Sequence, residues 1–128
     1  YEMRREERMR RARAWFTGHF KVTTWDELQA LAPAGSDENA SYRMVVTYWE
    51  MVASFITANV LDQELFFQSG RELLLVWERI RDILPALREK NSVAFAYSNL
   101  EIVAKAFIAY LERRSPGTYP AFSTRQRG

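Results

Sequence analysis

The segment from residue 37 to residue 58 constrains the fold of this chain more than any other. Ser36 is a suitable N-cap for a helix, and Asp37 and Glu38 follow where the helix dipole favours acidic side chains. Within residues 44–56 most side chains are apolar, and at helical spacing they fall on nearly every side. A helix of this length spans roughly 33 Å, the depth of a small domain. We therefore expect a long apolar helix at the centre of an all-α fold.

Shorter helices are predicted on both sides of this segment, and no segment alternates with the period of a β-strand. Capping-box patterns begin at Thr24 and Ser69, and Asp62 is a further N-cap candidate. Pro85 ends or kinks the helix before it. Helical periodicity predicts additional helices over residues 2–16, 25–31, 62–67, 70–84 and 93–113. The pattern indicates a compact bundle of about five to six helices.

The composition is typical of one globular domain. The chain has 128 residues, of which 48% are hydrophobic and 14% aromatic, so it can bury a core without a disulfide or a metal. We place the domain at residues 1–113 and expect a basic tail over residues 114–128, which Tyr119 and Phe122 pin to the bundle.

Several classes of protein are excluded by what the sequence lacks. There is no cysteine, which excludes disulfides, thiolate catalysis and thiolate metal sites. No apolar run is long enough to span a membrane, and the charged start does not have the pattern of a signal peptide. We therefore expect a cytoplasmic protein without a membrane span.

Basic residues are concentrated at the two ends of the chain. The net charge is +3 over residues 1–16 and +4 over residues 113–128, against −5 between them. Arg4, Arg8 and Arg11 share one face of the first predicted helix and could contact nucleic acid or another anionic surface. Glutamates on the same helix would repel phosphate, and no nucleic-acid-binding module is visible, so this remains a weaker alternative to solvated or internally paired ends.

The inventory for catalysis is small. His19 is the only histidine, which excludes His-pair metal sites, and it falls near a predicted helix end, where a structural role is expected. The glycines are isolated and form no phosphate-binding loop. We therefore expect a protein that is not an enzyme and has no cofactor.

Four residues are candidates for a pocket between helices: Tyr48, Glu50, Trp77 and Glu78. A buried carboxylate needs a partner or becomes protonated. Two inward carboxylates could form an acid–base pair or bind a metal, although the Glu-x-x-His motifs of helical dimetal sites are absent. The structural alternative is that Glu50 pairs with an arginine such as Arg43, Arg79 or Arg81.

Three stretches carry a resemblance to a known family. They are Tyr1-Glu2-Met3-Arg4-Arg5-Glu6 through Trp15-Phe16, Tyr42-Arg43-Met44-Val45-Val46-Thr47-Tyr48-Trp49-Glu50, and Glu64-Leu65-Phe66-Phe67-Gln68-Ser69-Gly70 leading into Val76-Trp77-Glu78. The chain resembles a family of small all-helical bacterial proteins described as a domain of unknown function. The resemblance implies a helical fold and a bacterial source, and it implies no activity.

Large aromatic side chains lie near helix ends and on short helices, where a small bundle does not bury all of them. Aromatics and arginines are the residue types enriched at interface hot spots. Our candidates for partner contact are Arg4, Arg8, Arg11, Trp15, Phe16, Phe20, Trp25, Phe66 and Phe67. We therefore predict a protein–protein interaction module, a homo-oligomer or an accessory subunit of a larger complex. The alternative is a small-molecule sensor with a pocket between helices.

Overall fold

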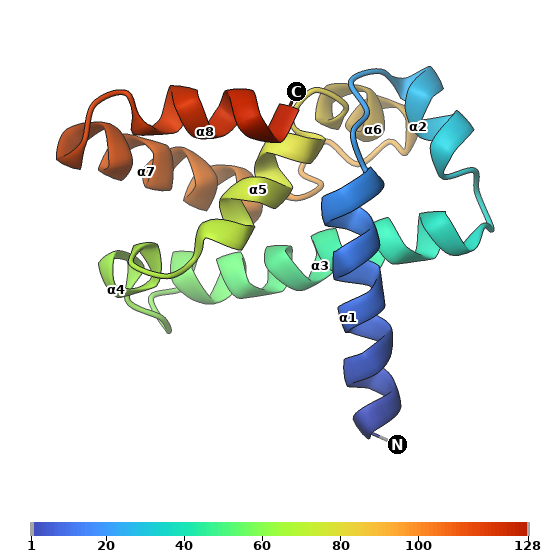
Figure 1. Cartoon of the computed structure of the whole chain (residues 1–128), viewed down its shortest axis with the longest axis horizontal. Coiled ribbons are helices and arrows are strands. Elements are labelled where there is room, and N and C mark those ends of the chain that lie inside the picture. The colour runs from blue at the N-terminus through green and yellow to red at the C-terminus, as the bar shows by residue number, and fades with distance from the viewer. Residues whose placement is uncertain (1, 128) are drawn as a thin grey trace.

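The computed structural model describes the backbone of residues 2–127 and the side chains of residues 6–126. Over this range the chain is all-α, as predicted, with eight helices and no strand (Figure 1). The helices are α1 (Glu2–His19), α2 (Trp25–Leu31), α3 (Asp37–Thr57), α4 (Gln63–Phe67), α5 (Arg71–Ile80), α6 (Leu84–Lys90), α7 (Ser98–Arg114) and α8 (Thr118–Arg127). The expected count of five to six helices is therefore too low.

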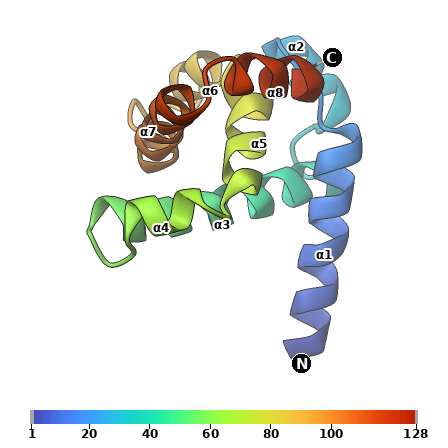
Figure 2. The ribbon, with the colours of Figure 1, turned by 60° about the vertical axis from the view of Figure 1, so that its left-hand side comes forward.

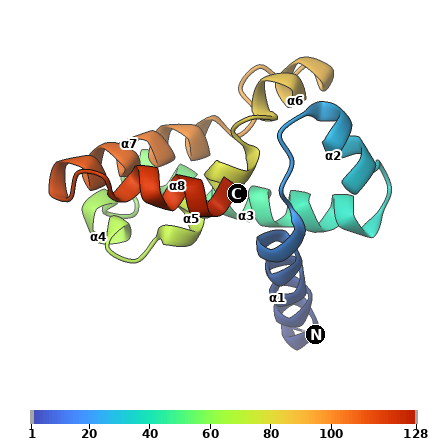
Figure 3. The same cartoon turned by 45° about the horizontal axis from the view of Figure 1, so that its top comes forward.

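The helices form two levels that meet where α3 packs against α7, and α5 also connects them. Helix α3 runs along one edge of the molecule, while α7 and α8 lie side by side on the other level (Figure 1). Helix α5 passes between the two levels and contacts α3, α7 and α8 (Figure 2). Helix α1 crosses α3 steeply, and its N-terminal half projects beyond α3, away from the other helices (Figure 3).

Local capping chemistry decides where several helices begin. Thr24 closes a full capping box with Glu27, and the side chains of Ser36 and Asp62 accept backbone hydrogen bonds at the starts of α3 and α4, as predicted. The capping box predicted at Ser69 is wrong. Gly70 is the N-cap of α5, and no side chain bonds to that helix end.

The central position predicted for the long helix is also wrong. Helix α3 has the expected length, but it buries one side only, with Val45, Val46 and Ala53 almost inaccessible. Tyr48 and Met51 are 39% and 46% exposed on the other side. The sequence places apolar residues on nearly every side of this helix, so it did not reveal that the neighbouring helices cover only one side.

The remaining differences lie in the C-terminal half. The segment expected as one helix over 70–84 is divided, because the chain turns after Ile80 and restarts as α6 with Pro85 in its first turn. The last predicted helix starts at Ser98 rather than residue 93, since the preceding residues form turns. The expected tail contains α8, whose Phe122 is buried in the core. The division at residue 113 stays a prediction.

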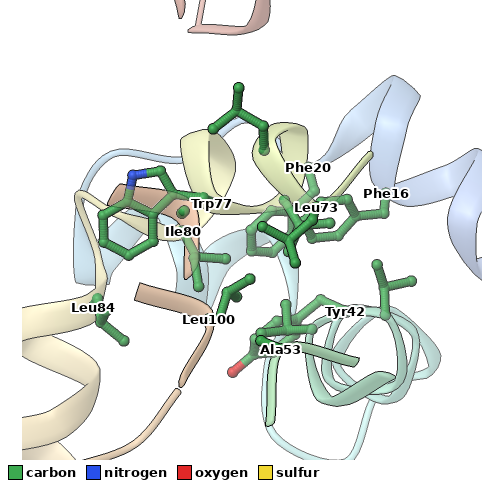
Figure 4. Close-up of a cluster of buried hydrophobic side chains, with 14 of the residues drawn as sticks. Phe16, Phe20, Tyr42, Ala53, Leu73, Trp77, Ile80, Leu84 and Leu100 are labelled. Atoms are coloured by element: carbon green, nitrogen blue, oxygen red, sulfur yellow. The ribbon is translucent and has the colours of Figure 1, made fainter. Parts of the chain in front are cut away.

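Aromatic stacking organises the core. Phe20 stacks on Phe16 and on Tyr42, with ring centroids 4.8 and 5.2 Å apart, and so fastens the end of α1 to α3. Figure 4 shows these rings converging with Leu73 and Ile80 of α5. Within the described residues, no helix combines the length and the apolar character that crossing a membrane requires.

Candidate functional site

A hollow of about 690 Å³ opens between α2, α3, α6 and the segment that leads into α7. Its size falls within the range of small-molecule pockets, roughly 300–1,000 Å³. It is lined by Trp25, Gln29, Ala34, Asn39, Tyr42, Arg43, Glu50, Leu87, Asn91, Val93, Phe95, Ala96 and Tyr97. These residues come from four separate segments of the chain, so no local sequence motif predicts the site.

Glu50 lines this hollow and also caps α7. Its Oε1 accepts the backbone N–H of Leu100 at 2.8 Å, and its Oε2 accepts the side-chain amide of Asn99 at 2.9 Å. Helix α7 needs this help because Tyr97, its own N-cap residue, offers no side-chain hydrogen bond. A carboxylate also suits the positive end of the helix dipole. The arginine partner predicted for Glu50 is therefore replaced by the first turn of α7.

Two tyrosines of the hollow favour their neutral form. Burial raises the pKa of Tyr97, although a hydrogen bond with Thr47 acts in the opposite direction. Burial, followed by the influence of Tyr97, likewise raises the pKa of Tyr42. Both groups therefore line the hollow as neutral phenols at ordinary pH.

The backbone beside the hollow is locally strained. Ser92 and Tyr97 have positive φ values of 55° and 56°, in the left-handed region that L-residues avoid. The segment between them provides Val93, Phe95 and Ala96 to the lining. Strained residues tend to cluster at functional sites, where the surrounding structure holds them in place.

The four residues predicted as a pocket do not come together. Glu50 lines the hollow, but Tyr48 is exposed on the outer side of α3 and Trp77 is 6% exposed in the core. Glu78 is 3% exposed and lies under α8, where it accepts hydrogen bonds from Tyr119 (2.5 Å) and Ser123. Glu78 therefore joins α5 to α8 and does not pair with Glu50.

The residues predicted for partner contact divide into two groups. Phe16, Phe20 and Phe67 are 1%, 0% and 4% exposed, so the structure corrects them from surface contacts to core residues. Trp15, Trp25 and Phe66 are partly buried against the same core. Their burial comes from contacts with other helices in the core, which the spacing of residues along one helix does not reveal.

The predicted basic face on α1 is only partly described. Arg8 and Arg11 are exposed, and they border a shallow hollow together with Asp37 and Glu38 at the start of α3. Two carboxylates thus accompany the positive charges. The side chain of Arg4 lies outside the described residues.

A continuous apolar strip on α3 is the feature that the sequence prediction missed. Met44, Tyr48, Met51 and Phe55, here called the α3 apolar face, follow each other at intervals of four, three and four residues. Tyr48, Met51 and Phe55 are among the exposed large hydrophobic side chains, and Met44 is partly buried. The heptad-like spacing was visible in the sequence, but there it was attributed to a buried central helix.

A groove runs beside this face. It has a volume of about 520 Å³, and Met9 of α1 lines it together with Met44, Tyr48 and Met51. Met9 of α1 therefore borders an open, largely apolar groove along α3.

No curated protein and no solved structure matches this chain. One family matches residues 1–107, which include α1 to α6, the whole lining of the hollow and the α3 apolar face. The chain belongs to the family described as a domain of unknown function, DUF4760.

Proposed function

We propose that this protein acts by binding rather than by catalysis, and that its α3 apolar face pairs with the same face of a second copy. The carrying observation is that Tyr48, Met51 and Phe55 are 39%, 46% and 42% exposed along one face of a well-formed helix. Contiguous exposed apolar surface of this kind marks interaction sites in folded proteins.

The spacing of the face suits self-association. In a two-fold pair with antiparallel α3 helices, Tyr48 of each copy lies opposite Met51 of the other, and Met44 lies opposite Phe55. Such a contact is isologous, because one patch serves both copies. The four side chains carry no charge, in keeping with the depletion of charged residues at interface cores.

The exposed apolar area supports a dimer. Val60 and Leu61 lie in the turn after α3, where their backbone N–H groups both donate to the carbonyl of Phe55. These two residues, with Tyr48, Met51 and Phe55, have exposed fractions between 39% and 71%. For side chains of roughly 150–250 Å² this amounts to roughly 400 Å² per copy. Two copies would together bury roughly 800 Å² of apolar area, and about 65% of a homodimer interface is apolar. The whole contact would therefore bury roughly 1,200 Å², within the range of specific interfaces.

The test is the molar mass in solution. We expect light scattering with size-exclusion chromatography to give a dimer at tens of micromolar. The variant Met51→Glu should be monomeric, because it places a carboxylate on the face of both copies. The matched control is Ile102→Glu on α7, where the side chain is 57% exposed and lies outside the face. This control should remain dimeric.

At a protein concentration low enough to dissociate the dimer, thermal unfolding of both variants by circular dichroism should match that of the wild type, since neither position is in the core. A wild-type protein that is monomeric up to about 100 micromolar would contradict the proposal. A Met51→Glu variant that keeps the dimer mass would contradict it equally.

A further inference from the structure

The hollow between α2, α3 and α6 contains one positive charge that no carboxylate of the described residues pairs with. Arg43 and Glu50 are the charged side chains in its lining. Both carboxylate oxygens of Glu50 already accept hydrogen bonds from the start of α7. Among the described residues, no carboxylate lies within ion-pair distance of Arg43. The guanidinium is therefore the charged group that remains available to a ligand.

The walls around Arg43 are aromatic. Trp25 comes from α2, Tyr42 from α3, and Phe95 and Tyr97 from the segment before α7. Phe95 is 76% exposed at the hollow, an unusual degree of exposure for a phenylalanine. The two tyrosines are neutral, so their hydroxyl groups add no negative charge that would repel an anion. An aromatic ring of a ligand would pack well against these side chains, since aromatic groups favour offset or edge-to-face packing.

We propose that this hollow binds a small aromatic carboxylate, with the acid group against Arg43 and the ring between Trp25, Phe95 and Tyr97. The planar guanidinium matches a carboxylate through two parallel N–H···O bonds. The volume of about 690 Å³ accommodates a molecule of one or two rings. Ser92 and Tyr97, both in the left-handed region, flank the segment that carries Phe95. This inference does not depend on the dimer, since the hollow is complete within one chain.

The chain contains four tryptophans, which provide an internal control for a titration by NMR spectroscopy. Of these, only Trp25 lines the hollow. We choose naphthalene-2-carboxylate as the probe and its uncharged amide as the matched compound. The carboxylate should shift the indole N–H resonance of Trp25 in a saturable manner while the other three indole resonances stay in place. The amide should bind at least about tenfold more weakly, because it lacks the charge-assisted bonds to Arg43.

Arg43→Gln should weaken binding of the carboxylate by about tenfold or more, to the level of the amide. The control is Arg11→Gln on α1, outside the hollow, which should bind like the wild type. Because Arg43 also borders the groove beside α3, the molar mass and thermal unfolding of both variants are measured alongside. Equal affinity for acid and amide, shifts in all four indole resonances, unchanged binding by Arg43→Gln, or no saturable shift would each overturn the proposal.

Discussion

Replacing Arg79 with methionine should destabilise the protein strongly, because its buried guanidinium, on α5, donates hydrogen bonds to both α1 and α8. Arg79 lies on α5 and is 5% exposed. Its Nη1 donates to the carbonyls of Phe16 (2.9 Å) and Phe20 (3.1 Å) at the C-terminal end of α1. Its Nε donates to the carbonyl of Gln126 in α8 at 3.0 Å. Burial lowers the pKa of Arg79, yet a guanidinium stays protonated, so a buried cation is held by carbonyl dipoles.

The magnitude follows from these contacts. A hydrogen bond that involves a charged group contributes about 1.5–3 kcal/mol, but bonds that share one guanidinium do not add fully. The carbonyl of Phe16 keeps its bond from the N–H of Phe20 after the substitution, whereas the carbonyl of Phe20 loses its donor. Methionine keeps the apolar stem and removes the cost of burying a charge. We therefore expect Arg79→Met to lower the free energy of unfolding by about 2–4 kcal/mol.

Urea denaturation at 25 °C, followed by circular dichroism, measures this change directly. The control is Arg13→Met, which removes the ion pair between Arg13 and Glu72. Because the Arg13 side chain is 49% exposed, this substitution should lower the free energy of unfolding by at most about 1 kcal/mol. The loss of unfolding free energy in Arg79→Lys should lie between those of Arg79→Met and Arg13→Met, because one ammonium group cannot reach α1 and α8 together. The reasoning is refuted if Arg79→Met loses less than about 0.5 kcal/mol or no more than the control.

Three further substitutions test other links in the fold. Tyr119→Phe should lower the free energy of unfolding by about 1.5–3 kcal/mol at pH 8, since it removes the donor to buried Glu78. Burial, followed by the bond to Glu78, raises the pKa of Tyr119 to about 12 from an ordinary value of 10.0. The difference in unfolding free energy between wild type and Tyr119→Phe should therefore be complete below pH 10 and shrink between pH 10 and 12. If denaturation curves give the same difference over that range, the assignment is wrong. Thr24→Ala should cost about 1 kcal/mol and accelerate hydrogen exchange in α2, because Glu27 loses the hydroxyl that its N–H bonds to. Glu50→Ala should cost about 1–2 kcal/mol and accelerate exchange of the first amides of α7, and protection equal to the wild type would show that the cap is unimportant.

The starts of the helices show how much of the structure local sequence patterns predict. Thr24, Ser36 and Asp62 each cap a helix within three residues of themselves, so the signal and the structure it produces lie in the same short segment. Ser69 has the same pattern and does not cap, because the N-cap residue of α5 is Gly70, one position later, and α5 begins at Arg71. Capping patterns thus locate a helix start to within a residue or two, and the packing of the segment decides the rest.

The candidate site was less accessible to sequence reasoning. Glu50 was recognised as a carboxylate in need of a partner, but the partners, Asn99 and Leu100, lie about fifty positions away and belong to the first turn of another helix. The lining aromatics Trp25 and Phe95 are brought to one hollow by the turns around α6. Nothing in the neighbourhood of either residue indicates the other.

The sequence by itself determined that the chain is all-α, that a long helix follows Ser36, and that local caps start the first helices, because these properties depend on spacing and on side chains a few residues apart. Only the tertiary structure decided which side of α3 is covered, since apolar residues surround the helix and the positions of α1, α5 and α7 select the buried side. The same packing brought Arg79 to the end of α1 and left Tyr48, Met51 and Phe55 exposed. Contacts between remote segments depend on how helices cross, and helical periodicity carries no information about crossing.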